Sequence, residues 1–154
     1  MAIETILLAV GPMDAVRGEE LADVVLEVAT PLEATVVVAH AFTAEEYEQL
    51  HDQLGFDERL ENVDPDEVAA RRAPVPDLVE IFENEGVDFE VHGAVGAHGA
   101  AVVDLAAAVG ADRIVVGGRR QTAAGKAVFG STSQQIMQSA HCPVTYVRDR
   151  SVME

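Results

Sequence analysis

The chain has 154 residues, 49% of them apolar, which is enough for one domain over residues 1–154 with a single core. It carries 27 Asp and Glu against 10 Lys and Arg, and this net charge of −17 argues against nucleic-acid binding because most of the surface would repel phosphates. No run approaches the roughly 18 apolar residues of a membrane span, and no signal-like start is visible. We therefore expect a cytoplasmic protein without a membrane partner.

The balance of charges also indicates an environment. Lys126 is the only lysine among the ten cations, while Asp and Glu dominate. This imbalance is typical of proteins from halophiles with a salt-filled cytoplasm, where a Debye length of about 3 Å at molar salt screens the repulsion between carboxylates. An ordinary acidic protein from a cell at moderate salt is the alternative interpretation.

The first half of the chain opens with a strand, a helix and a second strand. Residues 5–10 and 35–40 are apolar runs without alternation, as expected for parallel strands covered on both faces. Apolar residues between 21 and 28 follow helical spacing, and Asp14 and Pro31 mark the ends of that helix. After the second strand, an acidic insertion near 42–73 interrupts the pattern. We expect a short amphipathic helix over 45–54 and a solvated loop in the rest of it.

The second half alternates regularly. A helix over 78–82 ends near Gly86, a strand covers 89–92, and a helix over 102–109 ends near Gly110. A strand at 114–117, a helix after Gly130 and a strand at 144–147 complete the chain. Such alternation predicts an α/β fold, a doubly wound parallel sheet of five strands with helices on both faces.

A basic segment stands out in this acidic chain. Residues 113–148 hold five of the ten cations and no acid, a net +5, whereas the remaining 118 residues hold the other five cations and all 27 acids. Within the segment, Gly117 ends a strand and Gly130, Ser131 and Thr132 open a helix. Small residues and free N–H groups at a helix start favour an anion such as phosphate. Two alternatives remain open: Ser131 and Gln134 form a simple capping box, or the cations neutralise nearby carboxylates.

Other constellations give no catalytic or metal site. The five histidines lack ligand spacing, and Cys142 is the only cysteine. Ser131 has no evident base, so nucleophilic hydrolysis has no support. We therefore predict no metal ligands and no catalytic residues.

The segments 111–117, 130–133 and 141–147 resemble the universal stress protein family, and the resemblance extends over nearly the whole chain. It implies an adenine nucleotide α-hydrolase-like fold with strand order 3-2-1-4-5. Nucleotide-binding members carry a glycine, two residues, a glycine, nine residues, then glycine with serine or threonine. This chain keeps that length but has Arg120 at the second glycine, and it has Gly11 where an aspartate usually ends the first strand.

The resemblance also implies a ligand and the residues that contact it. ATP or AMP would bind, with Mg²⁺ alongside ATP, in the crevice where Gly11 and Gly117 end neighbouring strands. Arginine forks at Arg119 and Arg120 suit phosphate oxygens. Carried over by position, Val116 and Ala41 would flank the adenine, Gly117 would lie beside the ribose and phosphates, and Gly130, Ser131 and Thr132 would bind the phosphates.

The expected function is therefore a nucleotide-binding stress-response module. We expect no enzyme activity beyond slow ATP hydrolysis, because no residue is evident to position water or stabilise a transferring phosphoryl group. The resemblance implies a homodimer paired through the last strand, Val144 to Val147. The alternative is an interaction protein that binds no nucleotide and acts through dimerisation and partner docking.

Overall fold

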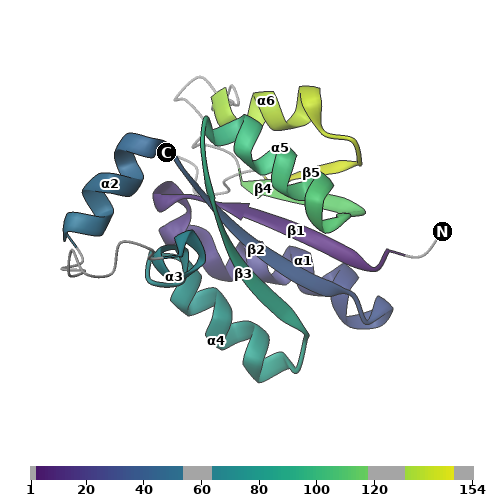
Figure 1. Ribbon diagram of the computed structural model, residues 1–154. Coiled ribbons are helices and arrows are strands. Elements are labelled where there is room, and N and C mark those ends of the chain that lie inside the picture. The colour runs from purple at the N-terminus through teal and green to yellow at the C-terminus, as the bar shows by residue number, and fades with distance from the viewer. Residues whose placement is uncertain (1–2, 54–63, 118–130, 148–154) are drawn as a thin grey trace, which may run out of the picture.

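The computed structural model describes residues 3–53, 64–117 and 131–147. Their centre is a five-stranded sheet in the order β3-β2-β1-β4-β5, with every neighbouring pair parallel (Figure 1). The strands are β1 (Thr5–Val10), β2 (Thr35–Phe42), β3 (Phe89–Val95), β4 (Arg113–Gly117) and β5 (Val144–Val147). The predicted fold class and strand order are confirmed.

Helices cover both faces of the sheet. On one face lie α1 (Gly18–Leu32), preceded by the 3₁₀ helix η1 (Pro12–Arg17), and α4 (Val75–Glu85); on the other lie α5 (His98–Val109) and α6 (Ser131–Ser139). Alternate residues of β1 enter the two cores: Leu8 packs on the α1 side and Leu7 on the α5 side, both fully buried. Gly86 and Gly110 end α4 and α5 in the left-handed conformation, as predicted.

The insertion after β2 is more ordered than the sequence predicted. The expected amphipathic helix is present as α2 (Ala44–Gln53), capped by reciprocal hydrogen bonds between Thr43 and Glu46. The prediction of a loop in the rest was wrong for α3 (Pro65–Ala70). There the Asp64 side chain accepts a hydrogen bond from the Asp66 N–H at 2.9 Å, and proline occupies the first helical position.

A small core under α3 explains why six residues are enough to form this helix. Val68 and Ala69 are fully buried and pack with Phe42 at the end of β2. Burial of one apolar face stabilises a segment too short to show helical periodicity in sequence. Among the helices described, none is both long and apolar enough to cross a membrane.

Candidate functional site

We use crevice for the region outside the carboxyl ends of β1 and β4, where the chain winds in opposite directions from two neighbouring strands. β1 pairs with β2 on one side and β4 on the other, and Ala9 stands level with both Ala39 and Val116. Just beyond these positions, Gly11 follows β1 and Gly117 ends β4. In doubly wound sheets, ligands bind outside the carboxyl ends of the strands at such a point.

Gly117 lies at the floor of this crevice, and a side chain there would crowd the Asp14 carboxylate. A Cβ atom at this position would lie 2.8 Å from the Oδ1 atom of Asp14, and 3.4 Å and 3.5 Å from atoms of Arg17 and Leu21. A side chain at Gly117 would therefore have to displace the Asp14 carboxylate. The backbone conformation of Gly117 does not call for glycine, because its φ is not positive.

Asp14 is the residue that fills this space, and sequence reasoning assigned it only to a helix boundary. Its Oδ2 atom accepts a hydrogen bond from the Gly11 N–H at 2.9 Å, and its backbone N–H donates to the Gly11 carbonyl at 3.0 Å. The Oδ1 atom lies 3.3 Å from Nε of Arg17. An acid three residues after Gly11, at a capping position, is a signal in the sequence for its hydrogen bonds with Gly11, but not for its contact with Gly117.

Burial dominates the electrostatics of this pair. The Asp14 and Arg17 side chains are 13% and 5% exposed. Burial raises the pKa of Asp14 above its ordinary value, against the hydrogen bond from Gly11 and the nearby charge of Arg17, which both lower the pKa. The floor of the crevice therefore holds a carboxylate whose charge is poorly solvated, although this chain has Gly11 where an aspartate usually ends the first strand.

The start of α6 is fixed against the same floor. The hydroxyl of Ser133, in the first turn of α6, donates to the Gly117 carbonyl at 3.2 Å. The backbone N–H groups in the first turn of a helix have no partner within the helix. This bond holds the positive end of α6 beside the end of β4, which is the arrangement required for an anion site.

The structure describes only some of the other residues that were predicted to contact the nucleotide. Thr132 is half-buried in the first turn of α6, and Ala41 is half-buried near the end of β2. Val116 is 2% exposed and its side chain packs in the core beneath α5 and α6, so its backbone is the part nearest the crevice. Arg119, Arg120, Lys126 and Gly130 lie outside the described residues, as does the side chain of Ser131.

His40 lies on β2 beside Ala41 in the chain, with its side chain on the opposite face of the sheet. It is 3% exposed, and its ring stacks on Phe42 with centroids 4.5 Å apart. Neither ring nitrogen has a hydrogen-bond partner in the described part of the chain. Burial, followed by the charge of Arg72, lowers the pKa of His40 to about 4. His40 is therefore neutral near pH 7.

The fold and this crevice together define a class: the chain is an adenine nucleotide α-hydrolase-like α/β protein, with the strand order and switch point of that fold. Residues 2–148 match the model of the universal stress protein family. The chain belongs to that family. No curated protein is similar enough in sequence to count as a match.

Solved structures share the fold over nearly the full length. A universal stress protein from Archaeoglobus fulgidus is 25% identical with a TM-score of 0.70, over 94% of this chain and 98% of its own. A structure of the Archaeoglobus fulgidus protein in complex with dAMP is 24% identical with a TM-score of 0.64, over 96% and 99%. An Arabidopsis thaliana family protein with AMP bound is 12% identical with a TM-score of 0.61, over 96% and 93%.

Proposed function

We propose that this chain binds an adenine nucleotide, AMP or ATP, in the crevice at the carboxyl ends of β1 and β4. The observation that carries the proposal is the hydrogen bond from Ser133 to Gly117, which holds the start of α6 beside the crevice floor. Phosphate oxygens would accept from the free N–H groups of the first turn. The adenosine would extend towards the end of β2 at Ala41.

The relatives support the adenine part of the proposal. The nucleotides dAMP and AMP are bound by the Archaeoglobus and Arabidopsis proteins respectively. The basic segment adds support in the sequence, because its five cations stand in an otherwise acidic chain. With ATP, Mg²⁺ would accompany the phosphates.

The proposed role is binding in a stress response, in the cytoplasm of a halophile, without rapid turnover. A helix start and a glycine hold a nucleotide but do not stabilise a transition state more than the ground state. Asp14 is the acid at the crevice floor, and Gly11 and Arg17 already engage it. Hydrolysis of ATP would therefore be slow.

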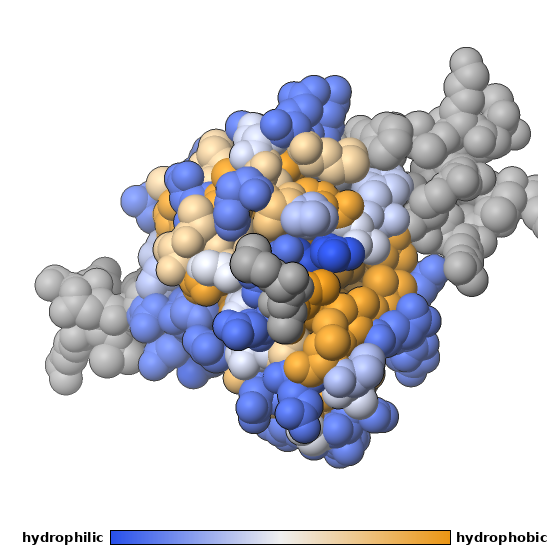
Figure 2. Space-filling view, turned by 90° about the vertical axis from the view of Figure 1, so that its right-hand side faces the viewer, coloured by the Kyte–Doolittle hydropathy of each residue, from blue (hydrophilic) through white to orange (hydrophobic). Residues whose placement is uncertain are grey.

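We also propose a homodimer paired through β5, the outermost of the described strands on its side of the sheet. An unpaired strand edge is a template for another strand. Val144 and Tyr146 are only half-buried within one copy. Figure 2 shows apolar residues gathered among charged ones on the side towards which β5 lies in Figure 1.

The second candidate is an interaction protein without a nucleotide. It is favoured by the occupied floor of the crevice, where the Asp14 carboxylate repels phosphate and already has partners in Gly11 and Arg17. In that case the basic segment would dock a partner protein.

Fluorescent AMP and ATP, titrated into the protein at molar KCl, separate the two candidates. We expect saturable binding by the wild type. Ser133→Ala should weaken it roughly 2- to 10-fold, because loss of one hydrogen bond of about 1 kcal/mol loosens the start of α6. Ser139→Ala, at the exposed far end of the same helix, is the matched control and should bind as the wild type does. Absence of saturable binding by the wild type would reject the nucleotide and leave the interaction protein.

A further inference from the structure

The second edge of the sheet, at β3, is closed by an element of the same chain. Just before and just after β3, the Asp88 carbonyl accepts from the Val36 N–H and the Gly96 N–H donates to the Phe42 carbonyl, so the even-numbered residues turn their backbone polar groups towards β2. The odd-numbered residues between them turn theirs outward. Gly93 is one of these, and its outward N–H donates to the Oδ1 atom of Asp66 in α3 at 2.7 Å.

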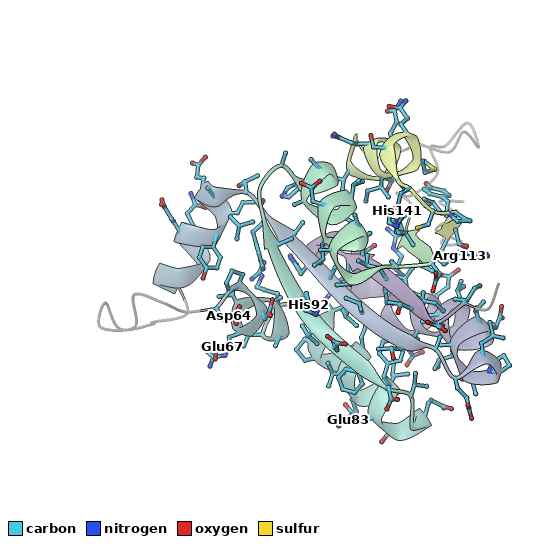
Figure 3. The ribbon with its side chains drawn as sticks, turned by 45° about the vertical axis from the view of Figure 1, so that its right-hand side comes forward. Asp64, Glu67, Glu83, His92, Arg113 and His141 are labelled. Carbon is cyan, nitrogen blue, oxygen red and sulfur yellow. The ribbon has the colours of Figure 1, made fainter. Side chains whose placement is uncertain are left out.

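Shape reinforces this hydrogen bond. A Cβ atom on Gly93 would lie 2.2 Å from the backbone carbonyl oxygen of Pro65, the first residue of α3. Only a glycine lets the helix approach so closely. The main packing partner of α3 is β3 itself. Figure 3 shows His92 of β3 beside α3, which begins after Asp64 and carries Glu67.

A histidine adds a further link at the same place. The Nδ1 atom of His92 lies 3.8 Å from Oδ2 of Asp66, while its Nε2 atom lies 3.1 Å from Oε1 of Glu90. Asp66 therefore contacts the strand through both carboxylate oxygens. Three contacts therefore hold α3 at the middle of the outer edge of β3: the hydrogen bond to Gly93, the close packing of Pro65 on Gly93, and the contact with His92.

We propose that α3 locks the outer edge of β3 against strand addition by a second copy of this chain, so that self-association is confined to the β5 edge. Outward groups on either side of Gly93 are about 6.6 Å away along the strand, so a helix at this position interrupts any incoming strand longer than two or three residues. The interruption is typical of protected sheet edges.

A second copy is the partner that this edge would otherwise take. The copies repel one another over most of their surface, because each carries a net charge of −17. Residues 91–95 contain no acid, and Val95 is 42% exposed. The strand itself therefore adds no charge repulsion at these five residues, and the acid that lies against them, Asp66, belongs to α3. With both edges open, each copy would pair twice and an open chain of copies would grow; with one edge locked, pairing closes at two.

The test measures molar mass by light scattering over a range of protein concentrations at molar KCl, with amide exchange read by NMR. In the wild type, we expect a molar mass that does not keep rising with protein concentration, as for a closed assembly. We also expect slow hydrogen exchange at the Gly93 amide. Gly93→Ala and Asp66→Ala should each give larger species that grow with concentration, and Asp66→Ala should speed exchange at Gly93 roughly tenfold or more. Asp66→Asn keeps an acceptor oxygen and should retain the wild-type mass.

Two further variants separate edge pairing from general misfolding. Ala94→Ser adds one atom at the next residue, on the opposite face of β3, and should leave the mass unchanged. Val95→Lys in the Gly93→Ala background places a charge on the opened edge and should restore the wild-type mass. Unchanged mass in both Gly93→Ala and Asp66→Ala, or a fast-exchanging Gly93 amide in the wild type, would overturn the proposal. Neither result depends on nucleotide binding.

Discussion

The chain buries ionisable groups in two different ways at the carboxyl ends of β1 and β2. At the β1 and β4 end, Asp14 keeps a hydrogen bond and a cation, and burial raises its pKa. At the β2 end, His40 lies against Phe42 without a hydrogen-bond partner in the described part of the chain, and burial lowers its pKa to about 4. In both places burial favours the neutral form of the side chain. Because one group is an acid and the other a base, their contributions to the free energy of unfolding depend on pH with opposite signs.

The largest effect that follows from this comparison is acid destabilisation through His40. Its pKa is lower in the folded chain than in the unfolded chain, so the unfolded state binds more protons between about pH 6.5 and pH 4. Stability from this group is present above pH 6.5 and is lost as the pH falls to about 4, by about 3 kcal/mol in total. Urea unfolding measured from pH 7 to pH 4 should show this loss.

His40→Phe is the matching variant, because it keeps an aromatic ring on Phe42 and cannot titrate. We expect its stability to depend less on pH than that of the wild type over the same range, whatever its absolute value. Equal slopes in the two proteins would show that His40 is solvated in the folded state.

A smaller effect is expected at the floor of the crevice. Gly117→Ala places a methyl group 2.8 Å from Oδ1 of Asp14, which displaces the carboxylate from Gly11 and Arg17. We expect a loss of roughly 1 to 3 kcal/mol in the free energy of unfolding, the usual cost of overpacking, together with weaker AMP binding. Chemical denaturation measures the first and the fluorescence titration the second.

The control for this variant is Gly11→Ala, because a Cβ atom at Gly11 has no neighbour within 4 Å among the residues that the structure describes. This glycine adopts an extended conformation with φ of −143°, which alanine also adopts. The substitution should leave stability nearly unchanged. An equal loss in both variants would place the strain outside the contact with Asp14.

The comparison also explains which features of the structure could be predicted from the sequence and which could not. Strands and helices with strong periodicity were predicted correctly, since each pattern is local to its element. The position of Asp14 was missed because its neighbour Gly117 lies more than a hundred residues further along the chain. The same holds for α3, whose contact from Asp66 to Gly93 spans 27 residues. Packing between elements decides both features, and a window of local sequence does not contain it.

The smallest expected effect tests the sign of the pH dependence of stability that Asp14 contributes. Its folded pKa is raised above 3.8, so the stability that this group contributes is present below that value and is lost as the pH rises through the folded pKa. Asp14→Asn keeps an oxygen that accepts from Gly11 and removes the poorly solvated charge. At pH 7, we expect its free energy of unfolding to equal or slightly exceed that of the wild type, by up to about 1 kcal/mol.

Asp14→Ala is the comparison, because it removes both the charge and the acceptor. It should lose about 1 kcal/mol, the usual cost of losing a capping side chain. If Asp14→Asn instead loses as much as Asp14→Ala, the charge of Arg17 rather than burial controls this carboxylate. The floor of the crevice would then be a stabilising ion pair, and the opposition between Asp14 and His40 would disappear.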